Sequence, residues 1–218
     1  MDLITSRICL WMLKIKNIAC LRDERQLFSD LSFLVRPGEM IQISGQNGAG
    51  KTSLLHLLTG LSTPYEGQIT WQGKPLQRIR DDWHSQLLWL GHQVGVKGAL
   101  TADENLSFYH PETSVDARWQ ALEQVELVGF EDVPVARFSA GQQRRVALAR
   151  LWLSRATFWI LDEPFTSLDV AGVQTLATRL EQHVVQGGAV ILTTHQPLRP
   201  LCVPLRTIML GEHVAAES

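Results

Sequence analysis

The chain has 218 residues, 45% of them hydrophobic; this length suits one large α/β domain, or a core with a small inserted subdomain, and is too short for two such domains. A formal net charge of −2 without a basic run argues against nucleic acid as the main partner, and no apolar stretch approaches the roughly 20 residues that cross a bilayer. The cysteines, Cys9, Cys20 and Cys202, lie far apart without CxxC spacing, which is typical of free thiols in a reducing compartment.

The N-terminal segment contains a short apolar run at residues 8–13. The run imitates a signal peptide, but six apolar residues are too few and lysines follow at once. We interpret it as the approach to a first strand at residues 13–18, which we expect at the edge of a sheet. Met12 is an alternative start of the protein, which would make the first eleven residues a dispensable extension.

A second strand is expected around residues 31–35, closed by the turn Arg36-Pro37-Gly38-Glu39. The first two strands are expected to pair in antiparallel fashion. A third, apolar strand at residues 40–43 leads into Gly45-Gln46-Asn47-Gly48-Ala49-Gly50-Lys51-Thr52, and leucines at helical spacing follow. This glycine-rich sequence therefore lies between a strand and a helix.

The placement predicts a phosphate-binding loop. Its glycines let successive backbone N–H groups turn toward one anion, and the following helix adds the positive end of its dipole. Lys51 would reach the outer phosphates of a nucleotide, and the Thr52 hydroxyl is suited to ligate Mg²⁺. A glycine-rich turn of no chemical consequence is the alternative, which the flanking strand and helix disfavour. Gly60 is expected to end the helix, and a short strand is expected at residues 68–71.

The pattern becomes helical from about residue 94 to residue 138. Within this stretch the spacing of Trp119, Leu122 and Val125 predicts that they share one helix face. We interpret residues 94–138 as a helical subdomain inserted into the core of a single domain that spans residues 1–218. The core would then comprise residues 1–93 and 139–218.

A polar, glycine-bearing segment opens the next helix. Ser139 and Gln142 have the spacing of a capping box, and apolar residues at helical spacing continue to Leu153. The N-terminus of this helix is either left open to bind an anion or simply well capped, and the residues leave both interpretations open.

An apolar run at residues 158–161 ends in two acids, Asp162 and Glu163. Such a run is typical of a buried central strand in a parallel sheet, which delivers carboxylates to the sheet's carboxyl edge. There Asp162 would organise Mg²⁺ and its waters, and Glu163 would face an attacking water. An ordinary solvated strand end is the common alternative. Against it, Pro164 breaks the strand, and the two carboxylates supply the groups for Mg²⁺ and for the attacking water that the phosphate-binding loop lacks.

The sequence Ser167-Leu168-Asp169 is expected to open another helix, and residues 189–194 to form another buried strand. His195 stands just past that strand, where a side chain would contact a terminal phosphate. Other histidines are interpreted as structural: His56, His84, His110, His183 and His213.

In this order, the motifs resemble those of the ATP-binding subunits of ABC transporters over nearly the whole chain. The resemblance implies an α/β fold, the P-loop NTPase of the ABC ATPase type: a RecA-like, mostly parallel sheet core with an antiparallel β edge and an inserted helical subdomain. It implies an ATPase that uses ATP and Mg²⁺ and forms a homodimer. In that dimer two ATP molecules lie head to tail, and the helix beginning at Ser139 in one chain caps the γ-phosphate held by the other.

The resemblance also implies residue roles. The catalytic residues are Lys51, Glu163 and His195. The metal ligands are Thr52, Asp162 and Gln93, the last of which also senses the membrane partner. The nucleotide-binding residues are those of the Walker A loop at 45–52, with Ser53 and Arg22. The signature that acts on the other chain's ATP is Ser139, Ala140, Gly141 and Gln142, and the D-loop contains Asp169.

Two positions depart from the family pattern. Ala140 replaces the second glycine of the signature, a small change that should leave the anion site usable. Arg22 stands where the family commonly stacks an aromatic side chain on adenine. Either its guanidinium stacks on the base, or Phe28 substitutes for the missing aromatic.

Finer features resemble the ATPase of cytochrome c maturation, the ATP-binding subunit of a haem exporter. They lie at residues 90–97, 100–106, 139–145 and 159–165. This resemblance implies a peripheral protein on the cytoplasmic face of a bacterial inner membrane, with integral membrane subunits of the CcmB and CcmC type. ATP hydrolysis would be coupled to haem export or to release of a haem-loaded chaperone of the CcmE type.

Three alternatives remain in view. The first is the ATPase subunit of an ABC exporter for another substrate. The second, a non-transport ABC ATPase in translation or DNA repair, usually carries two ATPase cores or a long coiled-coil insertion, which this chain lacks. The third, a nucleotide-gated module without hydrolysis, is disfavoured by the intact Asp162, Glu163 and His195.

Overall fold

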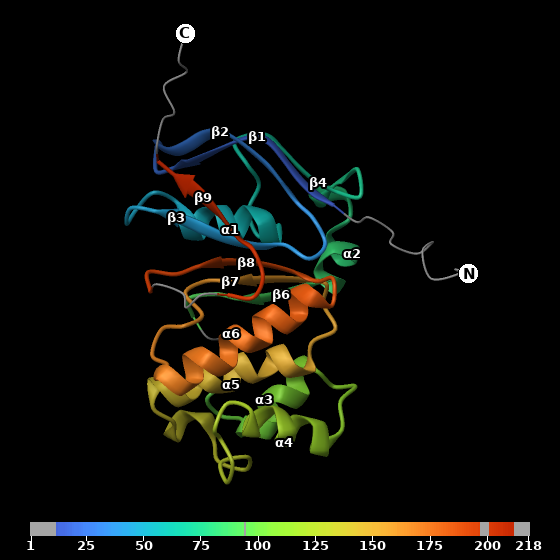
Figure 1. Ribbon diagram of the computed structural model, residues 1–218, viewed down its shortest axis with the longest axis vertical. Coiled ribbons are helices and arrows are strands. Elements are labelled where there is room, and N and C mark those ends of the chain that lie inside the picture. Colours follow the sequence, from blue (N-terminus) through green and yellow to red (C-terminus); the bar gives the residue numbers. More distant parts are fainter. Residues whose placement is uncertain (1–11, 94, 197–200, 212–218) are drawn as a thin grey trace, which may run out of the picture.

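The computed structural model describes residues 12–93, 95–196 and 201–211. Figure 1 shows an antiparallel sheet at one end, a parallel sheet in the middle and a group of helices at the other end. Cys20 is a buried free thiol and Cys202 an exposed one, as expected. Cys9 and His213 lie outside the described residues.

The antiparallel sheet has the strand order β2-β1-β4-β5. Its strands are β1 (Leu13–Arg22), β2 (Arg25–Val35), β4 (Glu66–Trp71) and β5 (Lys74–Pro75). β1 and β2 pair in antiparallel fashion, which confirms that prediction. The prediction of an edge position for the first strand is wrong, because β4 pairs along the other side of β1. The partner comes from a segment far along the chain, so the local pattern of β1 did not reveal it.

The parallel sheet has the order β6-β7-β8-β3-β9. Its strands are β3 (Met40–Gly45), β6 (Leu87–Leu90), β7 (Phe158–Leu161), β8 (Ala189–Thr193) and β9 (Leu205–Leu210). β7 is buried at every residue and pairs in parallel with β6 and β8, as its continuous apolar run predicted. β6 and β9 were not predicted. All neighbours run parallel, so the carboxyl ends of β3, β7 and β8 meet at one edge.

The α-helices are α1 (Lys51–Thr59), α2 (Arg80–Ser85), α3 (Ala102–Tyr109), α4 (Val115–Glu123), α5 (Ala140–Leu153) and α6 (Val170–Val185). Short 3₁₀ turns lie at η1 (Leu76–Arg78) and η2 (Val135–Arg137). Gly60 ends α1 in a left-handed conformation, as predicted. The prediction that Trp119, Leu122 and Val125 share one helix face is wrong for Val125. Trp119 and Leu122 lie three residues apart on α4, where Trp119 is 45% exposed and Leu122 is fully buried. α4 already ends at Glu123, so Val125 lies beyond the helix.

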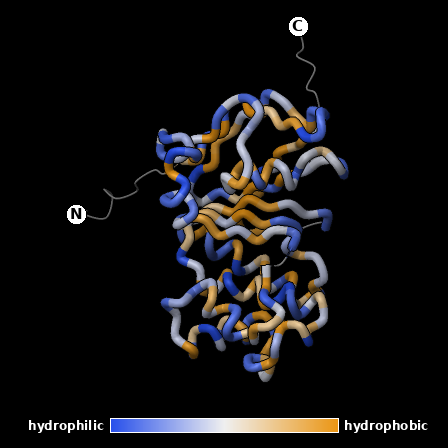
Figure 2. The backbone as a smooth tube through the Cα atoms, turned by 180° about the vertical axis from the view of Figure 1, so that it is seen from behind, coloured by the Kyte–Doolittle hydropathy of each residue, from blue (hydrophilic) through white to orange (hydrophobic). Residues whose placement is uncertain are grey.

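Hydrophobic side chains form one cluster on each face of the parallel sheet. Consecutive strand residues point to opposite faces, so Ile160 joins the cluster around α1 and the antiparallel sheet, whereas Leu161 joins the cluster with α3 to α6. Figure 2 shows the hydrophobic strands through the middle of the molecule, and Figure 1 shows α5 and α6 against one face of this sheet. Coverage of both faces explains why these strands read as continuous apolar runs.

His183, near the end of α6, is buried and its ring stacks on Trp159, with 3.7 Å between centroids. Its Nε2 lies 3.1 Å from the Thr157 carbonyl oxygen. Burial lowers the pKa of His183 from its ordinary value of 6.5 to about 4. The folded protein therefore holds this imidazole neutral at pH values where the unfolded chain protonates it.

Since the folded pKa is lowered, the contribution of His183 to stability is complete above pH 6.5 and is lost as the pH falls toward 4. Between pH 7 and 5 the free energy of unfolding should fall by about 2 kcal/mol from this group alone. Denaturant unfolding of the wild type and of His183→Gln at both pH values measures the difference. An equal loss in both proteins would contradict the assignment, since Gln does not titrate.

Candidate nucleotide-binding site

The predicted phosphate-binding loop connects the end of β3 to the start of α1. Gly50 caps the helix with a φ of 96°, and a Cβ there would lie 3.1 Å from Leu27 Cβ and 3.2 Å from the Phe28 ring. The positive φ therefore favours glycine, and a side chain would also be tight against β2. Lys51 Nζ folds back over the loop and donates to the carbonyl oxygens of Gly45 at 2.8 Å and Gln46 at 3.2 Å. The Lys51 ammonium is thus held at the loop by backbone carbonyl oxygens.

Asp162 follows β7 directly and is only 3% exposed. Its Oδ2 accepts a hydrogen bond from Thr52 Oγ1 at 3.0 Å, and its Oδ1 accepts one from Thr193 Oγ1 at 2.6 Å. The carboxylate therefore links the first turn of α1 to the end of β8. Two hydroxyl donors compensate for its burial.

Glu163 adopts a left-handed backbone with a φ of 50°, which is uncommon for a residue with a side chain. Its Oε2 accepts a hydrogen bond from the His195 N–H at 3.2 Å, and its Oε1 lies 3.5 Å from His195 Nε2. Oε1 is buried and accepts no hydrogen bond from the described residues. The carboxylate thus keeps one acceptor oxygen beside the histidine.

Arg144, on α5, is buried behind the two acids and is 5% exposed. Its guanidinium donates to the carbonyl oxygens of Asp162 and Glu163, both at 2.8 Å, and of Gly91 at 3.0 Å. Burial lowers the pKa of Arg144, and the neighbouring carboxylates oppose that shift. Sequence reasoning missed this residue and Thr193, because one lies within a helix and the other within an apolar strand.

One cleft brings most of the predicted residues together. The predicted residues that line it are Arg22, Asn47, Gly48, Gly50, Lys51, Thr52, Ser53, Asp162, Glu163 and His195. Residues that line it without having been predicted are Leu27, His92, Thr166 and Gln196. The cleft therefore combines the phosphate-binding loop with the carboxyl ends of β7 and β8.

Arg22 and Phe28 differ sharply in exposure. The Phe28 side chain is 8% exposed and packs beside Gly50, whereas the Arg22 side chain is 74% exposed at the cleft. A ring that is covered by the loop offers no free face to a base. Of the two, Arg22 is therefore the side chain with a surface available for stacking.

Gln93 lies in a different place from the other predicted metal ligands. It lines a groove with Trp89, Tyr109 and Arg150, next to the end of β6 and α3. The residue of this segment that lines the cleft is its neighbour His92. The loop after β6 thus connects the cleft to a separate surface groove.

The signature residues form the start of α5. The Ser139 side chain accepts from the Gln142 N–H at 3.2 Å, and the Gln142 side chain accepts from the Ser139 N–H at 2.9 Å, so the predicted capping box is confirmed. Ser139 and Ala140 are exposed, and a Cβ on Gly141 would lie 3.4 Å from the Ser167 carbonyl oxygen. These residues do not line the cleft formed by their own phosphate-binding loop.

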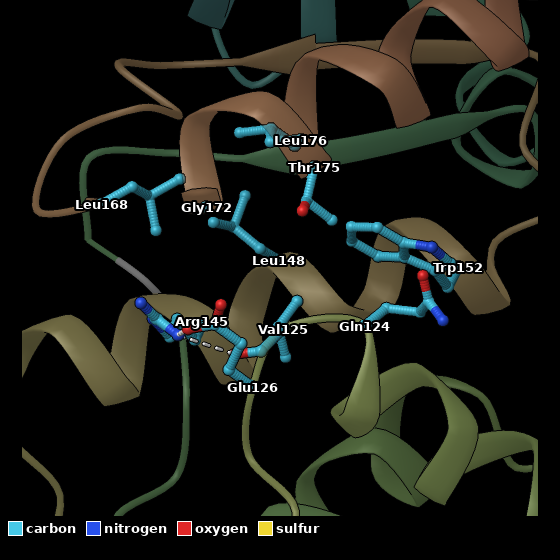
Figure 3. A pocket seen from close by; sticks show the side chains of 10 residues that line it. All are labelled: Gln124, Val125, Glu126, Arg145, Leu148, Trp152, Leu168, Gly172, Thr175 and Leu176. Atoms are coloured by element: carbon cyan, nitrogen blue, oxygen red, sulfur yellow. Dashed lines mark hydrogen bonds and ion pairs between the residues drawn. The ribbon is translucent and has the colours of Figure 1, made fainter. Parts of the chain in front are cut away.

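Asp169 caps α6 and accepts from the Gly172 N–H at 2.9 Å. Arg145 Nη2 lies 3.2 Å from the same carboxylate oxygen, and Arg145 also pairs with Glu126 beyond α4. Figure 3 shows Arg145 reaching toward Glu126 at a pocket between α5, α6 and the end of α4. The residues lining this pocket are Gln124, Val125, Glu126, Arg145, Leu148, Trp152, Leu168, Gly172, Thr175 and Leu176.

Comparison with known proteins adds independent information. Residues 28–166 match the ABC transporter family (ABC_tran). The chain is 59% identical over 201 residues to the "Cytochrome c biogenesis ATP-binding export protein CcmA" of Escherichia coli O157:H7, covering 92% of this chain and 97% of that protein. It is 58% identical over 205 residues to the protein of the same name from Escherichia coli K12, covering 94% and 99%.

Solved structures agree on the fold. A structure titled "Structure of ATP binding subunit of ABC transporter" aligns with a TM-score of 0.75 at 25% identity, covering 84% of this chain and 79% of that one. A putative ABC transporter ATP-binding protein from Pyrococcus furiosus aligns with a TM-score of 0.78 at 22% identity, covering 91% and 97%. This confirms the predicted P-loop NTPase fold of the ABC type, with its parallel and antiparallel sheets.

Within the described residues, no helix combines the length and the apolar composition that a membrane crossing requires. The phosphate-binding loop, the acids at the end of β7 and the histidine after β8 share one cleft, and the family match covers the first two of these features. The chain is therefore an ATP-binding ABC ATPase that belongs to the ABC transporter family, among the cytochrome c biogenesis ATP-binding export proteins.

Proposed function

We propose that this protein is the ATP-hydrolysing subunit of a bacterial inner-membrane complex for c-type cytochrome biogenesis. It couples hydrolysis to haem export or to release of a haem-loaded chaperone. The relatives named for cytochrome c biogenesis support the pathway, since they match at 58–59% identity over nearly their whole length. The observation that carries the chemistry is the single cleft that holds Lys51, Glu163 and His195.

The phosphates of ATP bind at the loop between β3 and α1. Backbone N–H groups and the N-terminus of α1 attract the anion, with Ser53 in the first turn. Lys51 Nζ exchanges its two carbonyl partners, Gly45 and Gln46, for phosphate oxygens. Arg22, exposed at the same cleft, stacks on adenine.

The Thr52 hydroxyl and the Asp162 carboxylate fit Mg²⁺, because both are oxygen donors and they lie 3.0 Å apart. Among the described residues, no group of three or more His, Cys, Asp or Glu side chains could hold a metal ion. A site with few protein ligands suits Mg²⁺ that is bound partly by phosphates and water. Bound Mg²⁺ would neutralise charge on the phosphates, and Gln93 would approach it only by moving from its present groove.

Hydrolysis proceeds by in-line attack of water on the γ-phosphate. Glu163 orients the water or takes its proton, for which its buried Oε1 is a suitable acceptor. His195, 3.5 Å from that oxygen, and Lys51 stabilise the charge on the phosphoryl group. Glu163 therefore acts on the attacking water, and His195 and Lys51 act on the phosphoryl group that it attacks.

The arrangement of the signature supports a homodimer. Ser139 and Ala140 are exposed at the start of α5 and outside their own cleft, so in the proposed dimer they are free to cap the γ-phosphate bound by a second chain. Asp169, at the start of α6, lies on the adjoining D-loop. In this proposal residues 94–138 form the helical subdomain, and residues 1–93 with 139–218 form the core.

The groove that contains Gln93 is the proposed contact for the membrane subunits. It lies between the end of β6 and α3, so a partner bound there would touch both the core and the helical subdomain. Closure of the dimer on ATP would move these parts and thereby the partner. The partners are integral membrane subunits of the CcmB and CcmC type and, indirectly, a haem chaperone of the CcmE type. The protein works peripherally on the cytoplasmic face.

Affinity purification from gently solubilised membranes tests the proposal. The tagged protein should recover two different membrane subunits, and ATP depletion or Glu163→Gln should trap a haem-bearing chaperone with them. Mass spectrometry identifies the chains and the absorbance of haem identifies the cargo. Recovery of an unrelated permease without haem would leave the ATPase chemistry standing and assign the protein to export of another substrate.

A further inference from the structure

We propose that Thr193 is a positioning residue for ATP hydrolysis, which holds the side chain of Asp162 and the backbone of Glu163 in their working positions. Arg144 completes this arrangement from the opposite side of Glu163. The inference rests on the roles that the proposed function gives to the two acids. It adds two residues, Thr193 and Arg144, that do not line the cleft themselves.

Thr193 is the last residue of β8 and is fully buried beside β7. Its hydroxyl donates to Asp162 Oδ1 at 2.6 Å and accepts from the Glu163 N–H at 2.9 Å. One hydroxyl therefore joins two consecutive residues that have different tasks. Only a side chain that both donates and accepts at one atom makes this connection, which threonine and serine do and valine does not.

The bond to Asp162 differs in kind from the bond on the other carboxylate oxygen. Asp162 Oδ2 pairs with Thr52, whose hydroxyl would turn to Mg²⁺ when nucleotide binds. Thr193 itself, unlike Thr52, is not a proposed ligand of ATP or Mg²⁺. We therefore expect its bond to Asp162 to persist when nucleotide binds and to keep the carboxylate from rotating when Thr52 leaves it.

The backbone of Glu163 needs support because its φ of 50° is a costly conformation for a residue with a side chain. Its N–H is bonded to Thr193 and its carbonyl oxygen to Arg144 Nη2 at 2.8 Å. Both polar groups of the residue are thus bonded to side chains from β8 and α5. This conformation aims the Glu163 side chain toward His195.

Arg144 also ties these acids to the segment after β6. Besides its bonds to the carbonyl oxygens of Asp162 and Glu163, its guanidinium donates to Gly91, two residues before Gln93. The side chain is buried, so these carbonyl oxygens replace water around its charge. A change at the start of α5 would therefore be felt at Glu163 and at the Gln93 loop together.

Thr193→Val and Thr193→Ser form a matched pair that tests the proposal. Valine keeps the shape but loses both hydrogen bonds, and serine keeps the hydroxyl. We expect kcat for ATP hydrolysis to fall about 10–100-fold in the valine variant, because small misplacements of reacting groups cost rates of this order. KM for ATP should stay within about twofold, since the phosphate-binding loop is untouched, and serine should restore most of kcat.

Hydrogen exchange in the nucleotide-free protein supplies a readout that does not depend on catalysis. The Glu163 amide should exchange at least about tenfold faster in Thr193→Val than in the wild type, because its acceptor is gone, and at a near-wild-type rate in Thr193→Ser. Should the valine variant fail to fold, Arg144→Gln takes its place and should lower kcat with KM unchanged, leaving the Thr193 hydroxyl intact.

Three results would overturn the inference. The first is a wild-type kcat in Thr193→Val. The second, where the valine variant does not fold, is a wild-type kcat in Arg144→Gln. The third is a serine variant as slow as the valine variant, which would indicate that Thr193 acts by packing alone. Glu163→Gln is measured in parallel. If that variant hydrolyses ATP normally, the proposed role of Glu163 fails. If it is inactive while Thr193→Val is fully active, only the positioning role fails.

Discussion

Glu163→Gln is expected to abolish steady-state ATP hydrolysis while leaving ATP binding intact. Glutamine keeps the size of the side chain and its contact with the His195 N–H, but it cannot take a proton from water. Loss of a general base typically lowers the rate by about 10²–10⁴-fold. Phosphate release under saturating Mg²⁺ and ATP measures the rate, and equilibrium binding of a fluorescent ATP analogue measures the affinity.

The same variant should collect in the ATP-bound dimer, because hydrolysis is the step that reopens it in the proposed cycle. Size-exclusion chromatography with ATP should then show a dimer that the wild type shows only transiently. Glu123→Gln is a suitable control, since Glu123 is exposed on α4 away from the cleft. Near-normal turnover in Glu163→Gln would rule out its assigned role.

The parts of the site that consist of consecutive residues could be predicted from the sequence. Glycines between an apolar strand and a helix identify the phosphate-binding loop, and Gly50 shows why. Its φ of 96° would strain any other residue, and a Cβ would be tight against Leu27 Cβ at 3.1 Å. Asp162 and Glu163 follow a fully buried strand, and such strands end at the ligand-binding edge of a parallel sheet. Local pattern and fold agree at these positions.

The contacts between distant segments could not be predicted in this way. Thr193 lies in a strand whose sequence is mostly apolar. Its hydroxyl reaches the Asp162 carboxylate only because β8 pairs with β7. Arg144 looks like one charge in a helix, yet it is buried against three carbonyl oxygens. The order of strands in the sheets also depends on distant segments. β4 pairs with β1 and gives it an interior position in place of the expected edge, and β9 pairs with β3.

Exposure also favours one of the two side chains, Arg22 and Phe28, that the sequence left open for stacking on adenine. An aromatic ring at Phe28 is chemically the better stacking surface for a base, but the chain buries it beside Gly50. Arg22, by contrast, lines the cleft and its side chain is exposed. The spacing of residues cannot reveal this, because it depends on the close approach of β2 to Gly50 in the phosphate-binding loop.

Lys51→Ala is expected to weaken ATP binding itself, in contrast to Glu163→Gln. The Lys51 ammonium lies over the loop on the Gly45 and Gln46 carbonyl oxygens, where phosphate oxygens would take their place. Hydrogen bonds to charged groups contribute about 1.5–3 kcal/mol, so the dissociation constant for ATP should rise about 10–100-fold. Titration calorimetry with ATP measures it, and thermal unfolding should show a smaller shift with ATP than in the wild type.

Lys74→Ala is the matched control, because Lys74 is exposed on β5 and does not line the cleft. Unchanged ATP affinity in Lys51→Ala would contradict the phosphate-binding assignment of the loop. The two main variants separate two kinds of interaction. An interaction that serves only the transition state lowers kcat alone, as expected for Glu163, whereas one that also holds the bound substrate raises the dissociation constant, as expected for Lys51. Finding both effects in one cleft would require that binding and hydrolysis occur there together.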